Sequence, residues 1–188
     1  IINSPKDDKK LLKACETLTK FSFGFTMEEA DRTVMLDYKK GKILYKKAHD
    51  KFVRAVDYGE RALTVKFGNY SDWIEGKTSK TPKFTSLDLS YLFWTAGAYG
   101  GAIKSSQGDP EWIVKLPRLC KLLETALSLD SEWNKGALYS AMISYTMIRH
   151  DSPINKEDVA REYFNKAIKI SSDLDLGPYV TLAAVSYT

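Results

Sequence analysis

The stretch FWTAGAYGGAI, residues 93–103, sets Gly97, Gly100 and Gly101 among aromatic and small apolar residues. Each glycine inside a helix costs about 0.5–1 kcal/mol relative to alanine. A helix that carries three of them is expected where another segment comes very close to its backbone. The stretch therefore predicts a helix over residues 86–106 that packs tightly against a neighbour.

Apolar residues recur every three or four positions along almost the whole chain, and no segment shows convincing strict alternation of apolar and polar residues. This spacing is typical of helices rather than strands, so we expect an all-α protein. The helices expected outside the glycine stretch are roughly 8–31, 38–66, 110–129 with a break at Pro117, 134–149, 155–170, and a last one that opens at Gly177 and Pro178.

Several helix starts have local signals. Asp109 is placed to cap a helix whose first residue is Pro110, where the missing N–H costs nothing. Asn155 and Asp158 form a loose capping box. The segment 68–86, rich in Gly, Ser, Thr and Pro, is expected as a long polar loop; loops of this length are usually functional or mobile.

Composition limits the classes of protein that the chain can belong to. Its 188 residues, 44% of them hydrophobic, suffice for one domain with a core that needs no metal or disulfide. Cys15 and Cys120 are too few for a disulfide framework and are expected as buried thiols. A net charge of +4 does not require a nucleic-acid partner, and the apolar run 89–103 is shorter than the roughly 20 residues of a spanning helix.

Three helices share a pattern of a small or apolar residue, a second residue four positions later and an alanine three positions after that. The three sets are Ala55, Gly59 and Ala62; Leu119, Leu123 and Ala126; and Ala160, Phe164 and Ala167. The pattern is typical of the second helix of a tetratricopeptide repeat, which packs closely on its first helix. The glycine stretch is then a first helix with Gly97 at the crossing. The spacing of 41 residues between Ala126 and Ala167 exceeds the usual ~34, so we expect a solenoid of degenerate repeats with inserted loops.

At a finer level the chain resembles the T component of tetratricopeptide-repeat-associated TRAP transporters. The segments that carry the resemblance are FSFGFTMEEAD (21–31), YKKAHDKFVRAVDYGERAL (45–63), YLFWTAGAYGGAI (91–103), DPEWIVKLPRLCKLLETALSLD (109–130), GALYSAMISY (136–145), AREYFNKAIKIS and GPYV. They follow the family's order and cover nearly the whole chain.

The resemblance implies a non-enzymatic accessory protein of the bacterial periplasm, tethered as a lipoprotein and assembled as a homotrimer. It implies binding to the transporter's solute-binding protein and a hydrophobic passage for an apolar or carboxylate-bearing ligand. Family members extend at both ends, so we expect a fragment that lacks the signal peptide and C-terminal helices. The start, IINSPKDDKK, is polar, and Lys13 does not fit a lipoprotein cleavage box ending at Cys15. The 68–86 loop matches no family pattern.

A ligand site can be proposed from the glycine helix. With Gly97 at the crossing, Tyr91, Trp94, Ala98 and Gly101 face the concave side, where small residues beside Trp94 leave room for an apolar channel. Leu138, Met142 and Tyr145 are expected on the neighbouring first helix. The alternative is that these aromatic side chains only fill the core.

The segment 39–54 contains seven cationic residues and one acidic residue, Asp50. Such a run is usually a solvated helix face. The functional alternatives are an anionic membrane surface or an acidic partner; nucleic acid is disfavoured because no binding motif or stacking aromatics accompany the charge.

Catalysis has little support in the sequence. GGAIKSS lacks the glycine that directly precedes the lysine of a phosphate-binding loop, here Lys104. His49 and His150 have no companions at metal-ligand spacing, and no GxSxG element is present. We therefore expect no enzyme activity, metal or cofactor. The alternative function is a general repeat scaffold that binds a peptide or protein segment in its concave groove.

Overall fold

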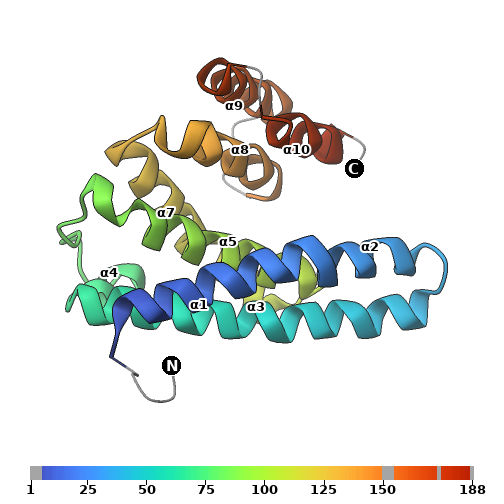
Figure 1. Cartoon of the computed structure of the whole chain (residues 1–188), viewed down its shortest axis with the longest axis horizontal. Helices are drawn as coiled ribbons and strands as arrows, with labels where there is room; N and C mark the ends of the chain where they lie inside the picture. Colours follow the sequence, from blue (N-terminus) through green and yellow to red (C-terminus); the bar gives the residue numbers. More distant parts are fainter. Residues whose placement is uncertain (1–5, 150–154, 173–174, 187–188) are drawn as a thin grey trace. The chain divides into compact units, whose positions relative to one another are not determined.

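The computed structural model describes residues 6–149, 155–172 and 175–186. Within these ranges the chain forms helices and loops and no strand, which confirms the all-α prediction (Figure 1). A tetratricopeptide-type arrangement of these helices remains a prediction. The chain divides into two compact units, Ile1–Leu122 and Leu123–Thr188, which we describe separately. Among the described residues, none of the helices combines the length and the hydropathy of a membrane-spanning segment.

A long helical hairpin forms the first part of unit 1. Its outgoing arm consists of α1 (Asp8–Phe21), a π-helical segment η1 (Ser22–Met27) and α2 (Glu28–Val34), and its return arm is α3 (Tyr38–Lys66) (Figure 1). The single helix expected over 8–31 is thus interrupted by a π segment. The Asp37 carboxylate caps α3 by accepting from the Lys40 N–H at 3.0 Å. Gly41 lets the arms meet, because a Cβ there would lie 2.6 Å from Val34 Cβ.

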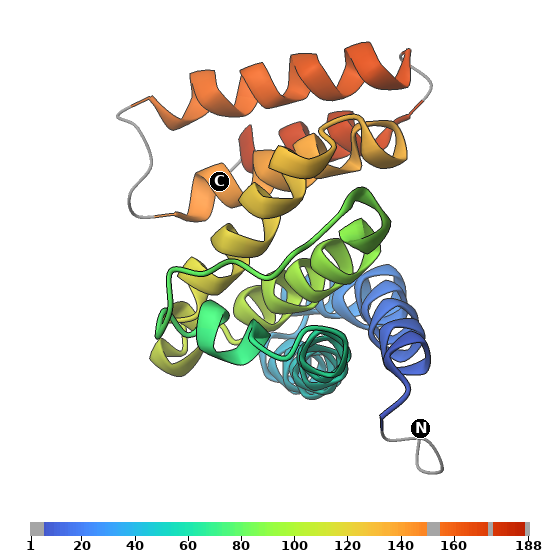
Figure 2. The same cartoon turned by 90° about the vertical axis from the view of Figure 1, so that its left-hand side faces the viewer.

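Helix α5 (Leu89–Ser105) packs against both arms of the hairpin and follows a short 3₁₀ turn, η2 (Ser86–Asp88). Figure 2 views α3 nearly end on, with α1 beside it and α5 above them. The core between the three helices contains fully buried side chains from each: Leu11, Phe52, Leu63, Leu92 and Ala98. This burial of apolar side chains is the main stabilising contribution to unit 1.

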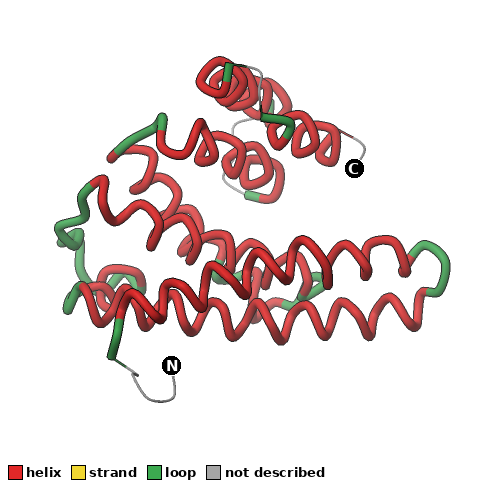
Figure 3. The backbone as a smooth tube through the Cα atoms, viewed as in Figure 1, coloured by secondary structure: helices red, strands yellow, loops and turns green. Residues whose placement is uncertain are grey.

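The segment 68–86 differs at its start from the expected polar loop. It begins with α4 (Tyr70–Ile74), whose Tyr70, Trp73 and Ile74 are buried. The remainder up to η2 is loop (Figure 3). It is held at Phe84, whose ring lies 5.4 Å from the Trp73 ring and 4.7 Å from the Phe67 ring. Burial of these aromatic rings outweighs the loop-like composition around them.

Two helices complete the middle of the chain. The Asp109 side chain accepts from the Glu111 N–H at 2.9 Å, and Pro110 opens α6 (Pro110–Ile113), as the sequence predicts. The next helix, α7 (Leu116–Leu129), has Pro117 as its second residue. The boundary between the two units falls within α7.

Unit 2 contains α8 (Trp133–Ile148), α9 (Lys156–Ser171) and α10 (Gly177–Ser186). The Asn155 side chain caps α9 by accepting from the Asp158 N–H, which is one half of the predicted capping box; the Asp158 carboxylate accepts from the Asn155 side-chain amide instead of its backbone N–H. The start of α8 differs from prediction, because residues 134–136 have left-handed backbone angles and the regular helix begins only after Gly136. Gly136 suits this position: its φ is +84°, and a Cβ there would lie 3.2 Å from the Ala167 backbone.

Candidate functional site

The close helix approach predicted from the glycines of α5 occurs at Gly101. A Cβ on Gly101 would overlap the ring of Phe52 on α3, with ring atom Cζ at 2.5 Å. At Gly97, where we expected the crossing, the nearest atom to such a Cβ would be Thr19 Cγ2 at 3.6 Å, an ordinary contact. The crossing is therefore one helical turn further along α5. We revise the role of Gly101 from a channel residue to a packing residue.

A second close approach brings α1, α3 and α5 together at Gly59. A Cβ on this residue would lie 3.0 Å from Thr95 Cγ2 and 3.1 Å from Cys15 Sγ. Ala55 and Ala62, four residues before and three after Gly59, are fully buried. The small residues of α3 therefore provide the surface on which the other two helices pack.

The packing at Gly59 encloses several polar groups. The Thr19 and Thr95 hydroxyls are buried and make no hydrogen bond within the described residues. The Cys15 thiol is directed at the Trp94 carbonyl oxygen, 3.5 Å away. Burial raises the pKa of Cys15 to about 12, so the thiol is neutral near pH 7. It lacks the thiolate character of a nucleophile.

The site residues predicted on α5 have different environments. The buried Tyr91 donates its hydroxyl to Asp8 Oδ2 at 2.7 Å, and Lys66 Nζ lies 4.2 Å from its ring. Burial, and then Asp8, raises the pKa of Tyr91. Trp94 is half-buried, with Lys20 Nζ 4.7 Å from its ring, and Ala98 is fully buried. Of these three, only Trp94 leaves much of its surface accessible.

The remaining predicted site residues are on α8 in unit 2. Leu138, Met142 and Tyr145 are buried, and the Arg149 guanidinium lies 5.0 Å from the Tyr145 ring. They belong to a different unit from Tyr91, Trp94 and Ala98. A channel lined by both sets therefore stays a prediction.

The residues predicted to pack helices together in unit 2 are buried or half-buried there. Ala126, Ala160 and Ala167 are buried, and Ala167 is the residue that the Gly136 backbone approaches. Phe164 is half-buried and packs edge-on against Tyr179 of α10, with 5.0 Å between ring centroids. These contacts join the three helices of unit 2.

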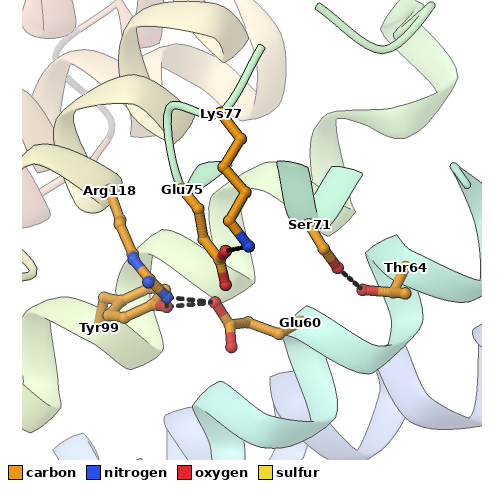
Figure 4. A network of polar contacts seen from close by, with 7 residues as sticks. All are labelled: Glu60, Thr64, Ser71, Glu75, Lys77, Tyr99 and Arg118. Carbon is orange, nitrogen blue, oxygen red and sulfur yellow. Dashed lines mark hydrogen bonds and ion pairs between the residues drawn. The ribbon is translucent and has the colours of Figure 1, made fainter. Parts of the chain in front are cut away.

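A polar network that sequence reasoning missed connects three helices of unit 1 (Figure 4). Tyr99 of α5 donates its hydroxyl to Glu60 Oε1 of α3. Arg118 of α7 reaches the same carboxylate oxygen and the Tyr99 hydroxyl, each at 3.3 Å. Burial, followed by the Glu60 charge, raises the pKa of Tyr99, which keeps its hydroxyl as a donor. The three residues are far apart in sequence, so no local pattern could reveal them.

Further polar groups surround this network. Lys77 forms an ion pair with Glu75 at 2.6 Å, and the Thr64 and Ser71 hydroxyls form a hydrogen bond at 3.2 Å (Figure 4). The Tyr70 hydroxyl is buried and has no hydrogen bond within the described residues, and burial raises its pKa. The ion pairs Arg118–Glu60 and Lys77–Glu75 therefore compensate each other's charges within unit 1. A carboxylate-bearing ligand could bind Arg118 only in competition with Glu60.

Three phenylalanines on and beside η1 are exposed, a feature that sequence reasoning also missed. The rings of Phe21 and Phe25 lie 5.2 Å apart and form an exposed apolar pair, whereas the Phe23 ring packs edge-on against the buried Phe52 ring at 4.7 Å. A π-helical turn is rare and often marks a functional segment. The extra residue in the turn changes which side chains face the core, and the periodicity of an ideal helix could not predict this.

The structure assigns His49 a packing role. Its Nδ1 lies 3.0 Å from the Ala102 carbonyl oxygen, and its ring meets Trp112 edge-on at 5.1 Å. His150 lies outside the described residues. Among the residues that the structure does describe, no cluster of His, Cys, Asp or Glu could hold a metal ion.

Comparison with known protein families gives a match over nearly the whole chain. The model of a family described as TRAP transporter T-component matches residues 1–187, nearly the whole chain. No curated protein matches the chain.

Proposed function

Because the chain belongs to the TRAP transporter T-component family, we propose that it is a periplasmic accessory component that binds the solute-binding protein of a TRAP transporter. The family match over residues 1–187 carries this proposal. We include in it a lipid tether and a homotrimeric assembly, which are properties that the family resemblance implies. The proposed role is non-enzymatic.

The exposed pair Phe21 and Phe25 of unit 1 is the surface that we propose for the protein partner. Both residues present apolar rings to solvent on the outgoing arm of the helical hairpin. Contiguous exposed apolar groups commonly mark protein interaction sites, and aromatic residues dominate binding energies there. Phe25 is the more exposed of the two.

Sedimentation velocity of the protein, alone and with the solute-binding protein encoded beside it, tests the proposal. We expect a trimer that shifts to a larger complex of fixed stoichiometry. Phe25→Ser is expected to weaken this complex, whereas Leu87→Ser, which changes an even more exposed apolar residue of unit 1, is not. A monomer whose sedimentation does not change when the solute-binding protein is added would contradict the proposal.

We further propose that an apolar or carboxylate-bearing ligand passes along a channel beside Tyr91, Trp94 and Ala98 of unit 1. A fatty acid brominated on its chain is a suitable probe, because bromine quenches nearby tryptophan fluorescence. Quenching is expected for the native protein, with a smaller effect in Trp94→Phe than in the control Trp73→Phe. Equal quenching in both variants, or none in the native protein, would contradict the role of Trp94.

A peptide-binding scaffold is the second candidate function. The partly exposed Glu60 and Arg118, together with Glu75 and Lys77, give unit 1 a charged face, which suits a polar segment better than an apolar ligand. Binding of unrelated peptides with no response to the solute-binding protein would favour this candidate.

A further inference from the structure

The apex of the unit 1 hairpin exposes large apolar side chains. Met35 and Leu36, in the turn between α2 and α3, are 84% and 91% exposed. Tyr38 and Ile43, in the first turns of α3, are also exposed. Figure 1 shows this turn at the end of the hairpin opposite the start of α1.

The turn itself does not require these apolar residues. Turns are usually rich in Gly, Pro, Asn, Asp and Ser, because these residues adopt the dihedral angles of a turn or hydrogen-bond to its backbone groups. Here Asp37 alone supplies the side-chain cap, and Leu36 only donates its backbone N–H to the Thr33 carbonyl at 3.0 Å. The apolar side chains of Met35 and Leu36 are therefore not required for the hairpin to fold, which points to a role in binding.

Cationic residues lie directly beside the apolar apex. Lys39, Lys40 and Lys42 are exposed, and none forms an ion pair within the described ranges. Lys42 instead lies 5.5 Å from the Tyr38 ring. In α2, Arg32 is paired with Glu28 at 2.8 Å. Glu29 and Asp37 are also exposed and form no ion pair within the described ranges, so three lysines face two carboxylates and the uncompensated charge next to the apex is net positive.

The charge of the chain is concentrated behind this apex. Residues 39–54 contain seven cationic residues and one acidic residue, whereas the other 172 residues contain 21 cationic and 23 acidic ones. The segment alone therefore accounts for the positive net charge of the chain. Apart from it, the chain is slightly acidic.

We propose that this apex docks on the surface of an anionic lipid bilayer. Met35 and Leu36 enter the boundary between head groups and acyl chains, and Lys39, Lys40 and Lys42 bind lipid phosphates. A turn that projects two apolar side chains would need a matching hollow in a protein partner, but a bilayer deforms around it. Basic residues beside an inserted apolar group are the usual combination for reversible binding at this interface. The inference is independent of the solute-binding protein.

Co-sedimentation with lipid vesicles tests the apolar part of the proposal. The full chain is mixed with vesicles of phosphatidylglycerol and phosphatidylcholine, or of phosphatidylcholine alone. We expect binding to the mixed vesicles and a loss of about tenfold or more in affinity for Leu36→Glu. Leu87→Glu is the matched control, because Leu87 is 87% exposed in unit 1 away from the apex; it should bind like the native protein.

A pair of double variants tests the charged part. Lys39→Glu with Lys40→Glu is expected to weaken binding to the mixed vesicles by about tenfold or more, because each basic residue near an anionic surface contributes substantially. Lys80→Glu with Lys83→Glu makes the same change in net charge at two exposed lysines of the α4–η2 loop. The affinity of this control variant for the mixed vesicles should stay close to that of the native protein.

Three outcomes would overturn the proposal. The native protein could show no preference for phosphatidylglycerol, Leu36→Glu could bind as well as the native protein, or the two double variants could be equally impaired. If Leu36→Glu instead lowers the oligomeric mass without vesicles and leaves vesicle binding unchanged, a second copy of the chain occupies the apex. Thermal unfolding of each variant shows that it is folded. Binding of the solute-binding protein is measured without lipid. Its outcome tests the proposed function separately and does not depend on the vesicle results.

Discussion

At the scale of single residues, Gly101 and Gly97 differ in what surrounds them, although they are one turn apart on α5. Gly101→Ala would force its Cβ into the buried Phe52 ring, and overpacking of this kind costs about 1–3 kcal/mol. Gly97→Ala should instead stabilise the protein by up to ~1 kcal/mol, because alanine favours the helix and space is available. Urea denaturation of both variants measures the difference. Equal stabilities would mean that α5 and α3 approach each other less closely.

The buried thiol of Cys15 predicts a loss of stability in alkali. Its pKa is raised by burial to about 12, from 9.0 for an unperturbed thiol. Above pH 9 the unfolded chain loses this proton while the folded protein keeps it, so ionisation favours unfolding. The free energy of unfolding should fall by at most about 1.4 kcal/mol per pH unit from this group.

The Cys15→Ala variant isolates this contribution. Its stability should depend less steeply on pH between 8.5 and 10, a range ending at the ordinary tyrosine pKa. The quantity compared is the slope, because the substitution also leaves a small cavity that lowers stability at every pH. A slope equal to that of the native protein would exclude Cys15 as its source.

At the scale of helices, the network of Tyr99, Glu60 and Arg118 connects α5, α3 and α7. Tyr99→Phe removes the buried donor to Glu60 and should lower stability by about 1–2 kcal/mol. Tyr38→Phe, at an exposed tyrosine of α3, should have almost no effect. In a double-mutant cycle, Tyr99→Phe and Glu60→Gln should couple by about 1 kcal/mol. Additive effects would show that the two residues do not interact in solution.

Helix ends were predictable where their cause is local. Asp109 with Pro110 and Asn155 with Asp158 determine the starts of α6 and α9 through neighbouring backbone groups, so spacing alone identified them. The start of α8 was misplaced because Gly136 adopts a left-handed conformation against the α9 backbone, and this contact is 31 residues away in sequence. Helix α4 was missed because its stability depends on burial beside Phe84 and Phe67.

The candidate site was less predictable than the helices, for a geometric reason. The glycines of α5 indicated a close crossing, but Gly97 and Gly101 lie one turn apart on nearly the same face. Only the position of Phe52 decides between them. The Tyr99 network and the exposed apex depend similarly on which side chains other helices cover, and a single sequence does not contain that information.

At the scale of the whole molecule, the uneven distribution of charge should govern binding to anionic surfaces in general. Net charge alone predicts weak retention on a cation-exchange resin, since the chain carries only +4. The concentration of seven cationic residues in 39–54 predicts stronger retention, because a local field attracts an oppositely charged surface before distant charges contribute. At 0.1 M salt, charges more than about 10 Å away are largely screened.

The two double variants with reversed charges separate these explanations. Lys39→Glu with Lys40→Glu and Lys80→Glu with Lys83→Glu both lower the net charge by the same amount, so a mechanism based on net charge predicts equal elution. We expect the variant in α3 to elute at clearly lower salt, because it divides the basic segment, and the loop variant to elute closer to the native protein. Coincident elution of the two variants would show that the lysines beside the apex do not act as a local binding surface. The prediction concerns charge alone, so Leu36→Glu should shift elution less than the α3 double variant, since it adds one negative charge and removes no lysine.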